Sequence, residues 1–309
     1  MRLRPGERAA FISDGFTISN YLTTGLLFLC AVWVGTVGAE PQTIPQRIVS
    51  INQCADELLL NLADSEQIAS VTYFTKNPQR SYDAAKAQNH PHNHGRIEEI
   101  ISFAPDLVLA GEFNARLTLN QLHALGIEVV EIKHAQALVD VVNNISLVAQ
   151  AIGHPERGRR LADPLKSLAD KTQQDVVGLV YQANGFAVGS QTLVDDVLAA
   201  VGIRNLAGEL GIRGAQTLSI ERLLWHQPDL LILDAQSSQA PSLAHQVLKH
   251  PALRSAYNVQ TVSVPTQAWT CGSHHTIKAI ESLRLVATQW RAANEGGNER
   301  IGNRVSAGH

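Results

Sequence analysis

The 309-residue sequence contains few sulfur-containing residues, few aromatic residues and no excess of positive charge. It has one methionine, three cysteines and 5% aromatic residues, and its formal net charge is -3. A nucleic-acid-binding protein needs a basic patch, and because none is found we expect no nucleic-acid partner. The 45% hydrophobic content and mixed charges describe a globular protein long enough for two domains.

The sequence also lacks common motifs of nucleotide-binding and catalytic sites. It has no glycine-rich phosphate loop, no Gly-x-Ser-x-Gly elbow, no Cys-x2-Cys pair and no His-Glu-x2-His motif. Gly185 and Gly189 follow an expected strand but lack the third glycine of a dinucleotide-binding turn. We therefore expect no enzymatic activity and no catalytic cofactor.

The first residues have the pattern of an export signal. Three arginines precede an apolar stretch over residues 21–37, and Val37-Gly38-Ala39 supplies the small residues that a signal peptidase requires. We expect residues 1–39 to be a signal peptide cleaved after Ala39, and the mature chain to lie in the periplasm. The region before the apolar stretch is long and contains acidic residues, so an uncleaved membrane anchor is the alternative. Leu29 before Cys30 does not suit a lipoprotein cleavage site.

One phrase occurs twice in the chain, with a spacing of 123 residues. Glu98-Glu-Ile-Ile-Ser-Phe-Ala-Pro-Asp-Leu-Val-Leu returns as Glu221-Arg-Leu-Leu-Trp-His-Gln-Pro-Asp-Leu-Leu-Ile-Leu. Each copy predicts a short helix, a Pro-Asp stop and a buried strand. One copy alone would be an ordinary junction between a helix and a strand, whereas two matched copies indicate two similar lobes.

The rest of the chain alternates short apolar runs with amphipathic segments, which is typical of parallel sheets covered by helices. The fold class is therefore α/β, with two similar lobes that each contain a mostly parallel sheet. The expected parts are an N-terminal lobe over residues 40–153, a bridging helix over 154–177, a C-terminal lobe over 178–293 and a disordered tail over 294–309. Pro164 either kinks the bridging helix or starts its second part.

The first strand, over residues 47–51, the doubled phrase, the helical bridge and the Trp269 turn before the last helix resemble the helical-backbone (class III) periplasmic solute-binding proteins. These are the receptors of ABC importers for cobalamin, ferric siderophores and haem. The resemblance covers residues 46–293 and implies a receptor without catalysis, here a monomer, that captures a small iron or cobalt chelate in a cleft between its lobes.

The resemblance also implies how such a receptor reaches its membrane partner. In the family, one glutamate on each lobe docks onto arginines of the permease, and Glu98 and Glu221 match these positions. The alternative is that each glutamate is only a favourable acidic residue in a first helical turn.

Ligand contacts are expected from the loops at the carboxyl ends of the strands. The expected ligand-binding residues are Asn52, Cys54, Tyr73, Phe74, His92, His94, Glu112, Trp269, Cys271, His274 and His275. Asn52 and Cys54 are equally well explained as a helix cap and a small buried residue. Stacking of a planar chelate on Tyr73, Phe74 and Trp269 is favoured, with the imidazoles and Arg96 as hydrogen-bond donors. Histidines stand where the corrinoid-binding relatives carry an aromatic residue, which weakens a cobalamin assignment.

Direct binding of a metal or haem by side chains is an alternative. Its candidate ligands are His92, His94, Cys271 and His274, whose donor atoms suit iron, zinc or copper. Their spacing is no known zinc signature, and the histidine run over residues 90–94 could equally be a solvated loop. An enzyme resembling a tetrapyrrole chelatase is a further alternative. Cys54 and Cys271 could form a disulfide across the cleft or remain a free or ligand-linked pair.

Overall fold

The computed structural model describes residues 43–168, 175–234, 250–254 and 260–306, together with residues 246 and 248. The expected signal peptide and most of the helix expected over residues 242–249 lie outside these residues. Both sheets of the structure belong to one compact unit. None of the described helices is both long and apolar enough to span a membrane.

The first sheet is parallel throughout and has the strand order β3-β2-β1-β4-β5. Its strands are β1 (Ile48–Ser50), β2 (Ile68–Thr72), β3 (His92–Asn93), β4 (Leu107–Gly111) and β5 (Glu128–Ile132). Its helices are α1 (Gln53–Leu62), α2 (Ala84–Ala87), α3 (Ile97–Ser102), α4 (Arg116–Ala124), α5 (Leu138–Ala151) and α6 (Pro155–Lys166), with the 3-10 turn η1 (Ser65–Gln67).

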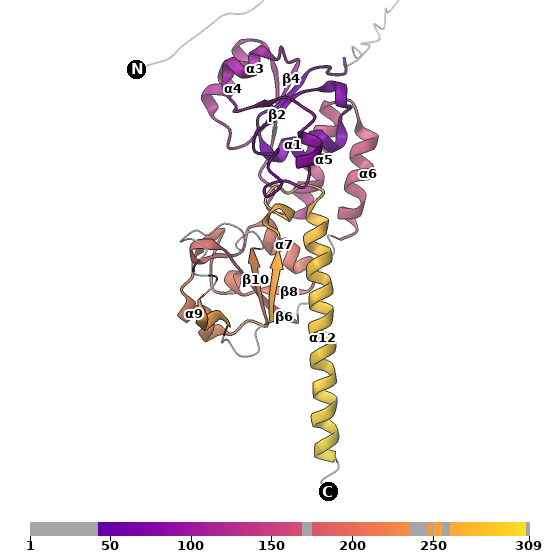
Figure 1. The fold of residues 1–309 in the computed structure, drawn as a ribbon. Helices are drawn as coiled ribbons and strands as arrows, with labels where there is room; N and C mark the ends of the chain where they lie inside the picture. The colour runs from indigo at the N-terminus through magenta and orange to yellow at the C-terminus, as the bar shows by residue number, and fades with distance from the viewer. Residues whose placement is uncertain are drawn as a thin grey trace, which may run out of the picture. The chain divides into compact units, whose positions relative to one another are not determined.

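Helices cover both faces of this sheet, with α3 and α4 on one side and α1 and α5 on the other (Figure 1). Val49 and Val108 pack toward α3 and α4, whereas their strand neighbours Ile48 and Leu107 pack toward α1 and α5. Because both faces are covered, every residue of β1 and β4 is buried, and β4 is a continuous run of apolar residues and glycine rather than an alternating pattern.

The second sheet has the order β11-β10-β6-β7-β9, with β8 paired to β6. Its strands are β6 (Val176–Tyr181), β7 (Phe186–Val188), β8 (Ile203–Asn205), β9 (Ala215–Thr217), β10 (Leu230–Asp234) and β11 (Gln260–Val264). The helices are α7 (Leu193–Ala200), α8 (Leu206–Glu209), α9 (Ile220–His226), α11 (Pro251–Arg254) and α12 (Thr276–Ser306), with the turns η2 (Ala183–Gly185) and η5 (Thr266–Ala268). The pairs of β10 with β6 and β11 are parallel, whereas β7 is antiparallel to both of its neighbours. The predicted fold class, two α/β sheets with flanking helices, is confirmed.

The doubled phrase forms the same unit in each sheet: α3 leads to β4, and α9 leads to β10. The structure explains why its aspartate recurs. The Asp106 carboxylate accepts hydrogen bonds from the backbone N–H groups of Gln46 and Arg47, just before β1. The Asp229 carboxylate accepts one from the N–H of Val177 at the start of β6, at 2.8 Å. Each aspartate therefore ties the start of one strand to the neighbouring strand.

Two predicted helix boundaries are wrong. The expected bridging helix over residues 154–177 contains α6, with Pro164 inside it, but Val176 and Val177 already belong to β6. Both valines are β-branched, which favours a strand. They pair with β8, and the strand that they begin, β6, also pairs with β10. The tail expected to be disordered from residue 294 instead continues α12 to Ser306. Extending an existing helix costs much less than nucleating one, so a weakly helical sequence can follow a strong helix.

Candidate ligand-binding site

A cavity of about 270 Å³ lies where the strands of the first sheet end at their carboxyl termini. Its walls come from the loops after β1, β2, β3 and β4. The lining residues are Ile51, Asn52, Gln53, Thr72, Tyr73, Phe74, Arg80, Asn93, His94, Gly95 and Asn114. Four of the predicted ligand-binding residues, Asn52, Tyr73, Phe74 and His94, are thus brought together from three separate loops.

Three rings form one aromatic surface at this cavity. The ring centroids of Tyr73 and Phe74 are 4.0 Å apart, and His94 stacks on Tyr73 at 4.8 Å with an interplanar angle of 29°. The Tyr73 side chain is 42% exposed, so this surface is open to a ligand. His92 contacts His94 edge to face at 5.6 Å, is exposed, and does not line the cavity.

The cation at the cavity is Arg80, which the sequence prediction missed. Its guanidinium carbon lies 4.9 Å from the centre of the Phe74 ring. The predicted donor Arg96 instead lies 3.6 Å from Glu99 and is not part of the cavity wall. Arg80 occurs in a polar stretch without periodicity, so no local pattern marks it as facing a ligand.

A smaller cavity of about 80 Å³ lies beside the first and shares Asn52 with it. Its walls are Asn52, Cys54, Gly111, Glu112, Phe113, Ile132, Lys133, His134, Ala135 and Cys271. Asn52 also caps α1, because its Oδ1 accepts hydrogen bonds from the N–H groups of Cys54 and Ala55. The Asn52 side chain therefore caps the helix and also lines both cavities.

The structure joins Cys54 and Cys271 in a disulfide bond across 217 residues of sequence. Of the pairings left open by the sequence, the bridge is therefore the one formed. The hypothesis that Cys271 ligates a metal is wrong for this state, because metals bind the thiolate and a disulfide sulfur has none.

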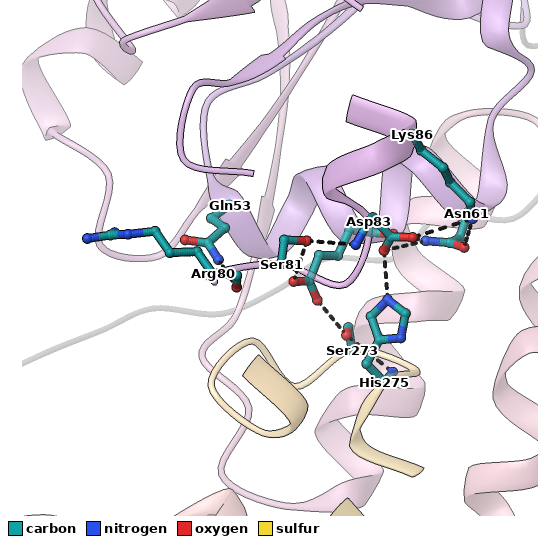
Figure 2. Close-up of polar contacts among 9 residues, drawn as sticks. Gln53, Asn61, Arg80, Ser81, Asp83, Lys86, Ser273 and His275 are labelled. Carbon is teal, nitrogen blue, oxygen red and sulfur yellow. Dashed lines mark hydrogen bonds and ion pairs between the residues drawn. The ribbon is translucent and has the colours of Figure 1, made fainter. Parts of the chain in front are cut away.

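Two hydrogen bonds accompany the disulfide, and we call these three links the clasp. The Ser273 hydroxyl donates to the Glu57 carboxylate at 2.7 Å, and His275 Nε2 lies 2.7 Å from Asp83 Oδ2. Figure 2 shows Ser273 and His275 pointing toward Ser81 and Asp83. The clasp fixes the loop after β11 against α1 and the start of α2.

Burial decides the ionisation within the clasp. Desolvation raises the pKa of the Glu57 carboxyl to about 7, although the Ser273 hydrogen bond opposes it. Burial is the largest influence on the pKa of Asp83 and raises it, but the hydrogen bond and charge of His275, together with Lys86 and Asn61, outweigh burial, and the pKa is lowered. Burial lowers the pKa of His274 to about 4, which leaves this imidazole neutral at pH 7.

Four predicted ligand-binding residues line neither cavity: His92, described above, and Trp269, His274 and His275. Trp269 is only 5% exposed and packs in the core, so its predicted stacking on a ligand is wrong. Burying a large aromatic side chain stabilises the fold strongly, so the ring can lie in the core even when its backbone belongs to a loop. His274 and His275 line neither cavity and instead lie at the clasp.

A second buried carboxylate, Asp56, fixes the loop that carries Tyr73. It is fully buried and accepts hydrogen bonds from the Thr72 N–H and from the hydroxyls of Thr72 and Thr75. Desolvation nevertheless raises its pKa to about 6. The aspartate therefore holds the end of β2 at a cost that grows as it ionises.

This cost predicts a pH effect in an Asp56→Asn variant. A raised carboxyl pKa means that the stability contributed by the protonated form is lost as pH rises from about 4 to about 6. The variant is neutral throughout, so its Tm minus that of the wild type should become more positive over this range. Thermal unfolding at pH 4, 5, 6 and 7 measures the difference. A constant difference across the range would contradict the raised pKa.

The two glutamates of the doubled phrase lie in the first turns of α3 and α9 and are both exposed. Ser219 caps α9, and bonds from the backbone N–H of Glu221 and from Ser219 lower the pKa of the Glu221 carboxyl. One turn further along α9, the Trp225 side chain is 84% exposed. On α3, Ile101 follows Glu98 by three residues and is 44% exposed.

The sequence matches the model of a protein family described as periplasmic binding protein over residues 48–264. This match spans most of the chain. The protein belongs to this family. A cobalamin-binding protein of Halobacterium salinarum is 22% identical over 210 residues, 65% of this chain and 57% of that protein. A vitamin B12-binding protein of Pectobacterium carotovorum is 24% identical over 239 residues, 71% of this chain and 79% of its own length.

Solved structures of periplasmic binding proteins share the fold. The haem-binding protein RhuT of Roseiflexus sp. RS-1 has a TM-score of 0.62 and 26% identity, covering 78% of this chain and 97% of its own. The vitamin B12-binding protein BtuF of Vibrio cholerae has a TM-score of 0.61 and 17% identity, covering 80% and 98%. These relatives are named as proteins that bind cobalamin (vitamin B12) or haem.

Proposed function

We propose that this protein is the periplasmic receptor of an ABC importer and captures a metal chelate at the cavity of the first sheet. Membership in the periplasmic binding protein family supports an extracytoplasmic receptor. The aromatic surface of Tyr73, Phe74 and His94 carries the assignment of the ligand. The clasp joins loops of the two halves through bonds within the chain itself, which lowers the ordering cost of capture.

The cavity favours a flat ligand that carries negative charge. Stacked rings attract planar conjugated groups, and the Arg80 guanidinium beside them suits a carboxylate of the chelate. An iron or cobalt complex of an organic ligand, such as a haem, a ferric siderophore or a corrinoid, fits this description. The exposed imidazole of His94 can donate a hydrogen bond to the ligand or bind its metal.

Docking to the permease is proposed for the helices that carry Glu98 and Glu221. Each exposes its glutamate in the first turn, with an apolar side chain nearby: Ile101 on α3 and Trp225 on α9. Exposed apolar residues beside charged ones are typical of protein interfaces, and tryptophan often supplies much of their binding energy. Arginines of the permease would pair with the two carboxylates.

A thermal-shift screen of residues 40–309 tests the proposal. The ligands are cobalamin, haem, several ferric siderophores and bare divalent metals, each in a separate titration. A bound chelate should stabilise the fold by about 2.7 kcal/mol at a concentration 100 times its Kd. Absence of any shift with the chelates would contradict the proposal. Insertion of a divalent metal into a porphyrin by the wild type, absent from a variant lacking His92 and His94, would instead show a chelatase.

Tyr73→Ala and Phe74→Ala variants locate the ligand. Each should weaken binding of the identified chelate about fivefold, because an aromatic stacking contact contributes about 1 kcal/mol. Isothermal titration calorimetry measures the Kd. Phe186→Ala is the matched control, since Phe186 is a partly exposed aromatic residue of β7 that lines neither cavity. Equal effects of all three variants would place the ligand elsewhere.

A further inference from the structure

A cluster of one carboxylate and two imidazoles lies at the clasp, outside both cavities. Asp83, His274 and His275 each offer one ligand atom, and these atoms lie within 4.8 Å of one another. Asp83 precedes α2, whereas the two histidines belong to the loop before α12. The cluster therefore joins distant parts of the chain, since 192 residues separate Asp83 from His275.

Two members of the cluster are buried, the third, His274, is partly buried, and one nitrogen is unsatisfied. Asp83 is 4% exposed and His275 is 7% exposed. Nδ1 of His274 is shielded from solvent and has no hydrogen-bond partner among the described residues. A buried polar atom without a partner is costly, which indicates that a ligand belongs there. A ring nitrogen with a free lone pair is the commonest metal ligand in proteins.

We propose that Asp83, His274 and His275 bind a divalent transition-metal ion, with zinc as the best match. Two imidazoles and one carboxylate are a donor set of zinc sites, whereas calcium and magnesium prefer oxygen ligands alone. Three protein ligands leave a fourth coordination position for a water molecule.

The contacts around Asp83 fit such a site after a small adjustment. Ligand atoms around a tetrahedral zinc ion lie roughly 3.3 Å apart, so the 2.7 Å contact between Asp83 and His275 must open slightly as the metal replaces the shared proton. Asn61 Nδ2 donates to the same carboxylate oxygen at 2.8 Å and orients it from outside the site. Lys86 lies 3.4 Å from the other oxygen, Oδ1. Its ammonium group, together with that of Lys278 near His274, lowers the affinity that we expect.

Such an ion would replace the hydrogen bond between His275 and Asp83 as the third link of the clasp and would add His274 to it. It would be structural and separate from the chelate, because none of its three ligands lines either cavity. The site therefore does not depend on the proposed receptor function. We expect metal binding to raise the Tm without competing with the chelate.

Titration of metal-stripped, tag-free protein with Zn²⁺ and Co²⁺ tests this site. Calorimetry should show one equivalent of zinc, and cobalt should give the visible absorption of a four-coordinate complex. The decisive variant is His274→Ala. The buried Nδ1 of His274 makes no hydrogen bond among the described residues, so we expect the variant to fold. It should nevertheless lose the cobalt spectrum and most of the zinc affinity. Asp83→Asn should have the same effect.

A His92→Ala and His94→Ala double variant is the matched control, since it removes the exposed histidine pair. This double variant should still bind one equivalent of zinc and give the same cobalt absorption spectrum as the wild type. Absence of binding by the wild type, unchanged binding by His274→Ala, or loss of binding in the double variant would each overturn the proposal. The last outcome would assign the metal to the histidine loop.

Discussion

A Glu98→Ala and Glu221→Ala double variant is expected to bind its chelate with wild-type affinity and to lose transporter-dependent uptake. Neither glutamate lines a cavity, so the ligand contacts remain intact. Losing one partner of a charge pair at an interface costs about 2–5 kcal/mol, so removal of two should reduce docking by more than a hundredfold. Calorimetry measures chelate binding, and uptake by cells or transporter-containing vesicles measures delivery.

The control for this experiment is a Glu66→Ala and Glu209→Ala double variant. It removes the same charge from one exposed position in each half of the chain, away from α3 and α9. Uptake should be unchanged in the control. Full uptake by the Glu98 and Glu221 variant, or loss of its chelate affinity, would contradict the assignment of these residues to docking.

Replacement of the disulfide in a Cys54→Ser and Cys271→Ser variant is expected to lower the free energy of unfolding by about 2–5 kcal/mol. The bond spans 217 residues, and such a long loop greatly restricts the unfolded chain. Denaturant unfolding of the oxidised wild type and the variant measures the difference. The slope of the transition should also increase in the variant, since its unfolded state exposes more surface.

A reductant supplies the control for the disulfide. It should shift the unfolding midpoint of the wild type toward that of the variant and leave the variant unchanged. Titration of the denatured, unreduced wild type with a thiol reagent should find no reactive thiol at positions 54 and 271. Two reactive thiols would show that the bridge is not formed.

The sequence predicted best what depends on local pattern. The doubled phrase gave α3, β4, α9 and β10 to within one or two residues, because apolar runs and Pro-Asp stops act over short distances. The strands β3, β7, β8 and β9 were not predicted. Each has two or three residues, too few for periodicity, and its pairing comes from neighbours distant in the sequence.

The candidate site was predicted in part for the same reason. Tyr73, Phe74 and His94 face a cavity as the positions after the strands indicated. The partners of Glu57 and Asp83 lie 216 and 192 residues away, so no spacing rule reveals them. Trp269 shows the opposite error. Aromatic residues are few in this sequence, so one in a loop suggested a surface on which a ligand stacks. Only the packing in the structure shows that the Trp269 ring is buried.

The separation between Cys54 and Cys271 also has a consequence for the biogenesis of the protein. Domains fold from the N-terminus as the chain emerges, so Cys54 becomes available long before its partner. Residues 40–309 contain no other cysteine, and a thiol waiting in an oxidising compartment therefore has no wrong partner within that stretch. Formation of the disulfide therefore indicates that the chain has been exported nearly to its end, because the bond can form only after the loop that follows the last strand has reached the same compartment.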